Sequence, residues 1–210
     1  ARWSGDHVSF KGSDLVPHFT NMPHREWIHL MAFMMGRHVI GYEVAKMMAL
    51  VDWIEQKAGE NSRVGIAGYA EGGLIAFYTA AVDTRIDGTL VSGYFKSRQQ
   101  SWEEPIYRHV WALLHEFGDA EIASLIAPRG LVIEYSEEPD VDSGPGPTPA
   151  PGRLETPGYD SVMAEYNRVD TLLKPGFQAR HFVHGIDDKT VAPGSVEALR
   201  RFTRLLDAES

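Results

Sequence analysis

Cysteine is absent from the 210 residues, so the chain has neither disulfides nor thiolate metal sites. No stretch reaches the roughly 18 consecutive apolar residues that suggest a membrane-spanning helix, so we expect no membrane span. Basic residues are the minority, 20 against 29 acidic ones, and the formal net charge is −9. A chain this acidic has no electrostatic reason to bind nucleic acid.

What remains is the composition of a globular protein, with 43% apolar and 23% charged residues. The length suits one domain, and we take residues 1–210 as a single catalytic-type domain. The segment 139–158 is dense in proline and glycine and is interpreted as a long surface loop within it. The chain begins Ala1-Arg2-Trp3, without an initiator methionine or a signal-peptide pattern, and we assign no compartment.

Apolar periodicity predicts strands that alternate with helices after an irregular segment over residues 1–36. Strands are expected at 63–68, 89–92, 131–135 and 178–183. Helices are expected at 39–59, 74–82, 106–117, 161–173 and 195–206, with a short helical turn between 118 and 128. This alternation predicts an α/β fold with a mostly parallel sheet and helices on both faces. Such sheets carry their chemistry at the carboxyl ends of the strands.

The sequence Gly68-Tyr-Ala-Glu-Gly72, followed by Gly73, lies between an expected strand and an expected helix. A nucleophile elbow has the pattern Gly-x-Ser-x-Gly in this context, because the turn is strained and the helix packs closely on the strand. Both glycines are in place, and Ala70 stands where serine is expected. A nucleotide-binding turn fits less well, because the spacing is not Gly-x-Gly-x-x-Gly.

The order of later residues agrees with the elbow. In α/β-hydrolases the nucleophile is followed by the acid and then by the histidine. The expected strand 131–135 is followed by Glu137, Glu138 and Asp140, and the last strand ends at His184, before the final helix. His184 is therefore the candidate general base, and these carboxylates are candidates for the acid.

Several short motifs together resemble a bacterial α/β-hydrolase group that includes dienelactone-hydrolase-like and acetyl-xylan-esterase-like enzymes. They are Pro23-His-Arg-Glu26, Gly36-Arg-His-Val-Ile-Gly-Tyr-Glu43, the elbow motif, Glu104-Pro-Ile-Tyr-Arg108, Phe117-Gly-Asp-Ala-Glu121 and Ala127-Pro-Arg129. The resemblance covers nearly the whole chain and implies a Ser-His-acid esterase. It places the nucleophile at Ala70, the base at His184 and the acid at Asp140, with Glu138 as the second choice.

Two departures from that group are visible. The serine is missing, and the strands that such a fold needs before the elbow are missing from the 69 residues ahead of Ala70. We therefore interpret the chain as the C-terminal, site-bearing part of the fold. The backbone N–H of Glu71, at the start of the helix, is expected to supply half of an oxyanion hole.

Other polar residues are candidates for binding substrate. They are Tyr69, Arg37, His38, Glu104 and Arg108. Arg37 and His38 lie just before the expected helix 39–59 and are equally well explained as a solvated cap of that helix. Glu104 is an alternative acid, although an ion pair with Arg108 explains it more simply. Trp27, Trp102 and Trp111 are expected in the core or in a pocket wall, and Asp187-Asp188 as a loop. No metal site and no cofactor are expected.

The preferred hypothesis is a serine ester hydrolase that acts on a carbohydrate or small-molecule ester, with its serine replaced by alanine. A natural pseudoenzyme that binds a ligand or partner is the second hypothesis. A prolyl-oligopeptidase-like peptidase shares the fold and ranks lower, because nothing in the sequence indicates a site for a peptide N-terminus. The first two hypotheses differ in the natural sequence from which this chain derives. A serine at position 70 of that sequence would favour the ester hydrolase over the natural pseudoenzyme.

Overall fold

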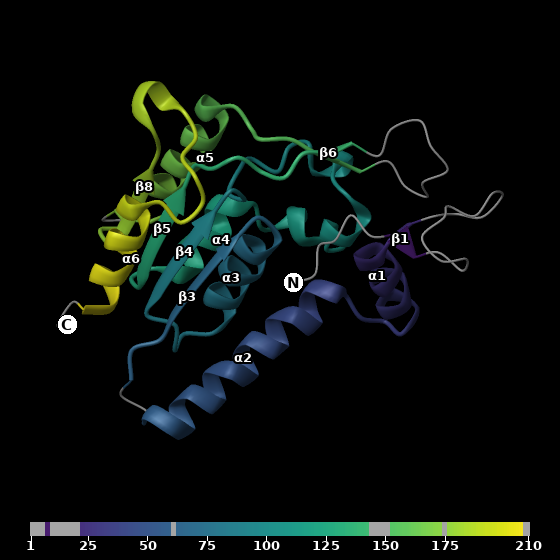
Figure 1. Cartoon of the computed structure of the whole chain (residues 1–210), viewed down its shortest axis with the longest axis horizontal. Helices are drawn as coiled ribbons and strands as arrows, with labels where there is room; N and C mark the ends of the chain where they lie inside the picture. The colour runs from purple at the N-terminus through teal and green to yellow at the C-terminus, as the bar shows by residue number, and fades with distance from the viewer. Residues whose placement is uncertain (1–6, 9–21, 60–61, 143–151, 174–175, 208–210) are drawn as a thin grey trace.

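A four-stranded parallel sheet forms the centre of the protein (Figure 1). The computed structural model describes residues 7–8, 22–59, 62–142, 152–173 and 176–207. The strands are β3 (Gly65–Tyr69), β4 (Gly88–Ser92), β5 (Gly130–Glu134) and β8 (Arg180–Val183), and they lie in the order β3-β4-β5-β8. Every neighbouring pair is parallel, so all four strands end at the same edge of the sheet.

The two central strands are buried along their whole length, including the polar residues Thr89, Ser92 and Glu134. β3 lies at one side of the sheet, and among the described strands it pairs with β4 alone. Its residues alternate between exposed and half-buried. A hollow of about 710 Å³ runs along this strand, lined by Val39 and Met47 on one side and by Ile66 and Ile75 on the other.

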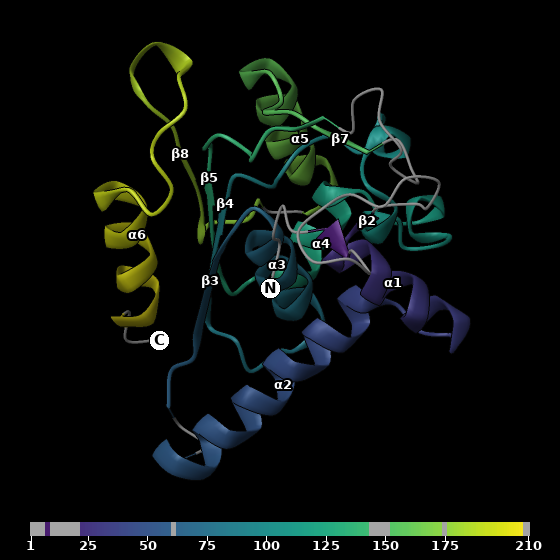
Figure 2. The same ribbon diagram turned by 45° about the vertical axis from the view of Figure 1, so that its right-hand side comes forward.

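The described residues form six α-helices, and four of them cover the sheet. One face is covered by α3 (Glu71–Val82), α4 (Asp119–Ile126) and α5 (Tyr159–Leu172), and the other by α6 (Val196–Asp207) (Figure 2). The long α2 (Val39–Ala58) packs against α3, and α1 (His24–Met34) lies at its N-terminal end. In the described part of the chain, no helix is both long and apolar enough to cross a membrane.

Alternation along the strands divides the core between the two faces. Val91, Leu131 and Ile133 point toward α3 and α4, where Phe77 and Ile126 are fully buried. On the opposite face, the core cluster consists of Leu90, Val132, Val183 and Ala198, with Val191, Phe202 and Leu205 packed against it. The predicted α/β architecture, with a parallel sheet and helices on both faces, is confirmed.

The prediction of a helix over 106–117 is wrong. This segment forms two short 3-10 turns, Ile106–Arg108 and Leu113–His115, and Ala112 between them has φ 61°. The irregular segment expected over 1–36 contains α1, which the sequence analysis missed. In the loop expected over 139–158, β6 (Val141–Asp142) and β7 (Arg153–Leu154) pair as a short antiparallel ladder, and 143–151 lie outside the described residues.

A histidine caps α2. The Nδ1 atom of His38 accepts a hydrogen bond from the backbone N–H of Ile40 at 3.1 Å, and its Nε2 lies 3.2 Å from the carbonyl oxygen of His109. This arrangement requires a neutral ring with its proton on Nε2. The His29 ring is buried 4.6 Å from the His38 ring, and burial together with His38 and Arg25 lowers the pKa of His29 to about 4.

Acid should therefore weaken the packing of α1 on α2. A folded-state pKa below the unfolded value of 6.5 means that the unfolded chain binds more protons between pH 6.5 and 4. The stabilisation by neutral His29 is complete above pH 6.5 and is lost as pH falls toward 4. We expect a loss of roughly 2–3 kcal/mol of unfolding free energy, measurable by urea denaturation at both pH values.

The matched variants are His29→Leu and His115→Leu, the latter at an exposed histidine. His29→Leu should flatten the pH dependence, and His115→Leu should leave it unchanged. Equal pH slopes in all three proteins would show that His29 is not held neutral.

Candidate functional site

The turn between β3 and α3 is strained at Ala70. Its backbone has φ 51° and ψ −117°, a region that residues other than glycine rarely adopt. The Ala70 N–H donates to the carbonyl of Ser92 at 2.9 Å, and its carbonyl accepts from Leu74 at 3.0 Å. Such conformations cost of the order of 1–3 kcal/mol and persist where the surroundings enforce them. A sharp, strained strand-to-helix turn is the geometry of a nucleophile elbow.

Two glycines make this turn possible. They are Gly68 and Gly73, whereas the sequence motif led us to expect Gly68 and Gly72. A Cβ on Gly68 would lie 2.0 Å from the carbonyl oxygen of Gly72, and one on Gly73 would lie 2.9 Å from that of Ser92. A Cβ on Gly72 would meet no atom within 4 Å. The expectation that Gly72 is needed for close packing is therefore wrong, and Gly73 has that role.

A small pocket opens over the elbow. Its volume is about 200 Å³, and its lining consists of Tyr69, Ala70, Glu71, Gly72, Arg108, Pro139 and Leu154. The Tyr69 hydroxyl donates to the carbonyl of Glu137 at 2.8 Å, which holds the loop after β5 beside the elbow. The amide of Glu71 is the first of α3, where no intrahelical acceptor precedes it. Of the candidate substrate-binding residues, Tyr69 and Arg108 reach this pocket.

Arginines neutralise the carboxylate next to the elbow. Glu71 is buried and forms a short ion pair with Arg108, and its second oxygen lies 3.4 Å from Arg25. Arg25 in turn makes a bidentate pair with Glu43 of α2, at 2.5 and 2.7 Å. The first helical turn is thereby joined to both N-terminal helices through charged hydrogen bonds.

The pairing continues on the other side of Arg108. Glu104 contacts Arg98 at 2.9 Å, Lys96 at 3.1 Å and Arg108 at 3.4 Å. Burial would raise the pKa of Glu104, but these three cations lower it to about 2. Glu138 contacts Lys96 at 3.1 Å and Arg108 at 3.6 Å, and burial raises its pKa despite these cations. The expected ion pair between Glu104 and Arg108 is confirmed.

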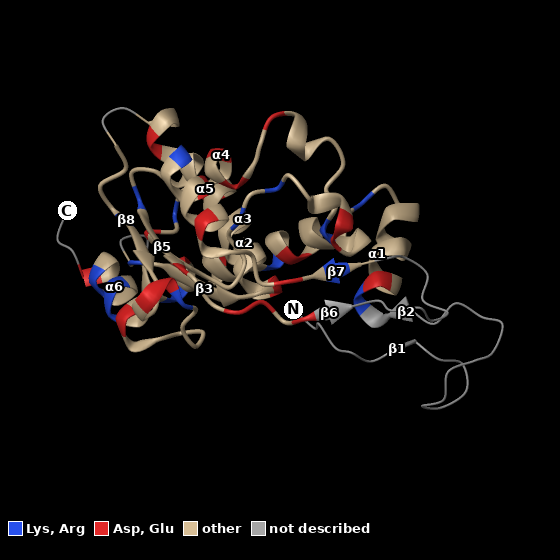
Figure 3. Cartoon of the chain, turned by 90° about the horizontal axis from the view of Figure 1, so that it is seen from above, with Lys and Arg blue, Asp and Glu red and all other residues tan. Residues whose placement is uncertain are grey.

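We call this connected set the buried charge network. Its members are Arg25, Glu43, Glu71, Lys96, Arg98, Glu104, Arg108, Asp119 and Glu138. Figure 3 shows acidic and basic positions interspersed along the segments that connect the sheet with α1. Because each charge has an opposite neighbour, the attraction between these charges offsets the cost of removing them from water.

The structure does not place His184 in the elbow pocket. His184 follows β8, three strands from β3, which corresponds to roughly 14 Å across the sheet. Its ring packs against Tyr159 and Phe182, and its Nδ1 lies 2.9 Å from the carbonyl oxygen of Gly185. The carboxylate in contact with Nδ1 is that of Asp188, at 3.5 Å.

Neither candidate acid contacts His184 in the described structure. Asp140 is exposed and has no ion pair to a described residue, whereas Glu138 belongs to the buried charge network. Asp188 lies in a loop, as expected from the sequence, but its carboxylate faces His184. Its four-residue spacing from His184 is the signal that could have suggested it, and both Asp187 and Asp188 have positive φ, at 55° and 56°.

The loop after β8 folds back toward the elbow beyond His184. The N–H of Val191 donates to the carbonyl of Tyr135 at 2.9 Å, and the Thr190 hydroxyl lies 3.4 Å from a carboxylate oxygen of Glu137. The backbone of Glu137 is the acceptor for Tyr69. The returning part of this loop therefore brings Thr190 toward the elbow.

The remaining candidates are structural or exposed. His38 is the cap of α2, Arg37 is exposed, and Glu104 belongs to the buried charge network. Among the described residues, no group of three or more His, Asp or Glu side chains is arranged to hold a metal ion.

Comparison with known proteins gives one distant similarity. The chain is 30% identical over 101 residues to the Bacillus subtilis (strain 168) protein named "Putative hydrolase YtaP". The aligned segment covers 45% of this chain and about a third, 34%, of that relative. No family model matches the chain, and no solved structure matches it significantly. The similarity indicates a distant relation to a hydrolase and does not extend to a substrate.

The glycine contacts give a direct test of the elbow geometry. Gly68→Ala should destabilise the protein by more than about 3 kcal/mol, because the new Cβ would overlap backbone atoms that cannot move aside. Gly72→Ala is the matched control and should change stability by less than about 1 kcal/mol, since its Cβ enters open space. Urea denaturation measures both. Equal losses would contradict the turn as described.

Proposed function

We propose that this chain carries the site of a serine-type ester hydrolase in which position 70 has lost its nucleophile. In its present form it binds a small-molecule or carbohydrate carboxylic ester without cleaving it. The observation that supports this proposal is the strained backbone at Ala70, on a strand-to-helix turn with a pocket above it. The distant similarity to a hydrolase agrees with it.

The chemistry follows from the position of each group. A serine hydroxyl at position 70 would attack the ester carbonyl carbon while a base takes its proton. The negative charge on the carbonyl oxygen would be stabilised by the N–H of Glu71 at the start of α3. Return of the proton to the alcohol would release it, and water would then cleave the acyl group by the same route. The methyl group of Ala70 can accept no acyl group.

His184 is the proposed base, acting through Nε2 after the loop that follows β8 has moved toward the elbow. Its Nδ1 already faces the carbonyl of Gly185 and the carboxylate of Asp188, which favours a proton on Nδ1 and a free Nε2. Asp188 is accordingly the positioning carboxylate that we favour on contacts. Asp140, the acid that the family resemblance implies, is the alternative.

Restoring the nucleophile is the test. Ala70→Ser should raise the rate of p-nitrophenyl acetate hydrolysis by at least about 10³-fold over the starting protein, because loss of one triad member costs that much or more. The matched control Ala70→Gly adds no nucleophile and should remain inactive.

The base is tested in the serine variant. Adding His184→Ala should remove most of the gain, and adding His181→Ala should preserve it, since His181 lies within β8 and contacts Arg201 of α6. A loss with His181→Ala alone would contradict His184 as the base.

A binding module without catalysis is the second candidate function. The observation that favours it is the separation of His184 from the elbow pocket, since a natural pseudoenzyme has no need to keep the base beside the nucleophile position. This candidate predicts that Ala70→Ser binds ester ligands but gives no rate increase. The same assay therefore separates the two candidates.

A further inference from the structure

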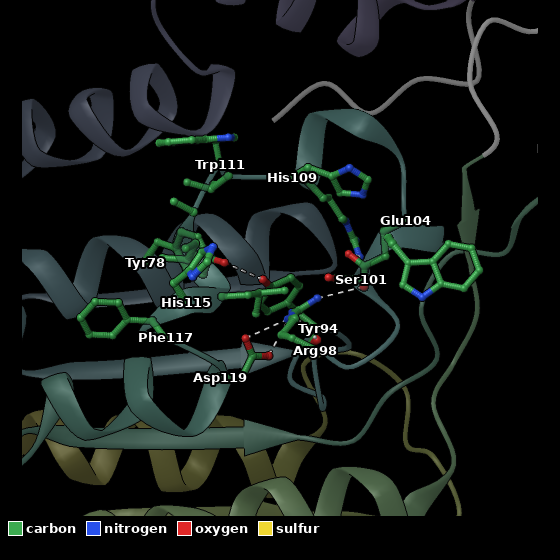
Figure 4. A pocket seen from close by; sticks show the side chains of 16 residues that line it. Tyr78, Tyr94, Arg98, Ser101, Glu104, His109, Trp111, His115, Phe117 and Asp119 are labelled. Carbon is green, nitrogen blue, oxygen red and sulfur yellow. Dashed lines mark hydrogen bonds and ion pairs between the residues drawn. The ribbon is translucent and has the colours of Figure 1, made fainter.

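A second pocket lies on the side of the sheet that α3 and α4 cover (Figure 4). Its volume is about 330 Å³, near the lower end of the range for small-molecule sites. Tyr78, Tyr94 and Arg98 lie together in its lining, which also includes Trp102 and Trp111. We call it the aromatic pocket.

The two tryptophans are unusually exposed. Trp102 is 72% exposed and Trp111 is 91% exposed, although burying an indole ring is strongly favourable. The backbone contributes to this: the left-handed Ala112 interrupts the segment where we had expected a helix, next to Trp111. Strained positions of this kind often occur where side chains are held ready for a ligand. Neither tryptophan is in the core, so of the two expectations the pocket wall is correct.

The charged side chains that line the pocket are paired with one another. The guanidinium of Arg98 lies 4.1 Å above the Tyr94 ring and makes a bidentate pair with Asp119, with both bonds at 2.9 Å. Its third contact is with Glu104 at 2.9 Å. An ionic ligand would find these charges already paired, and so the pocket suits a neutral one.

Hydroxyl and imidazole groups also line the same space. The Tyr94 hydroxyl lies 3.2 Å from that of Tyr78, and Ser101, His109 and His115 complete the polar lining. Hydroxyl and imidazole groups can both donate and accept, which suits a ligand with several hydroxyl groups.

We propose that the aromatic pocket binds a neutral sugar ring. A pyranose has an apolar face of C–H groups that packs on an indole, and it carries hydroxyl groups around its rim. The pocket combines exposed indoles with hydroxyl and imidazole groups, and its volume suits a single small ring. It shares Arg108 with the elbow pocket, but the proposal does not depend on the chemistry proposed there.

Calorimetric titration of the whole chain tests the proposal. The probes are methyl β-D-glucopyranoside, methyl α-D-mannopyranoside and methyl β-D-galactopyranoside, each at up to tens of millimolar. We expect at least one to bind, and D-glucuronate and cyclohexanol to bind at least tenfold more weakly. Trp111→Ala and Trp102→Ala should each weaken binding at least tenfold, whereas Trp111→Phe should retain part of it.

The matched control is Trp53→Ala, which removes an exposed tryptophan on α2 outside the aromatic pocket. Trp53→Ala should bind the pyranosides with the affinity of the starting protein. Ala70→Ser should also leave the pyranoside affinity unchanged, whatever the esterase activity of that variant. Binding by none of the three pyranosides would overturn the proposal. So would equal binding of cyclohexanol, tighter binding of glucuronate, or an equal loss with Trp53→Ala.

Discussion

The ion pairs around Arg108 are the interaction on which the rest of the site depends. This one buried guanidinium contacts Glu71 at the elbow, Glu104 after β4 and Glu138 after β5. Three segments that are distant in sequence therefore meet at one cation. Losing a partner in such a set leaves a buried charge unpaired, which is far more costly than the net gain from any one pair. The segments consequently hold their relative positions as a unit.

The same pairing explains how a strained turn can persist. Glu71 follows Ala70 directly, and its carboxylate is fixed on one side by Arg108 and on the other by Arg25. With the first residue of α3 held in this way and Gly68 packed against Gly72, the backbone at Ala70 has little freedom to relax. In the reaction proposed for this site, pairing of the Glu71 carboxylate with the two arginines also matters for its own amide, because an unpaired carboxylate there would repel the proposed oxyanion.

Much of the framework could be predicted from local patterns. The segments that form β4 and β5 have apolar centres, Leu90-Val91 and Leu131-Val-Ile133, and α2 shows a regular helical repeat, so their positions were predicted within a few residues. The conformation of the segment 106–117 was not predicted correctly, because Tyr107 and Arg108 are buried and Ala112 adopts a left-handed backbone conformation. Tertiary contacts outweighed helix propensity there.

The site was only partly predictable for a related reason. A strand-to-helix turn leaves a local signature of glycines, so the elbow could be found from sequence. Ion pairs such as Arg25–Glu43 join residues 18 positions apart, and single sequences hold no signal for them. The four-residue spacing of His184 and Asp188 suggests this contact, but the contact depends on how the chain folds after β8, where two aspartates adopt positive φ.

The open side of β3 has a consequence for how the molecule associates. Within the described chain this strand pairs with β4 only, so its outer backbone groups face the hollow beside α2. Unpaired strand edges are templates for a further strand. A segment added there would run next to Gly68 and Tyr69, immediately before the elbow. Any strand that paired there would therefore lie beside the turn at position 70, at the same edge of the sheet.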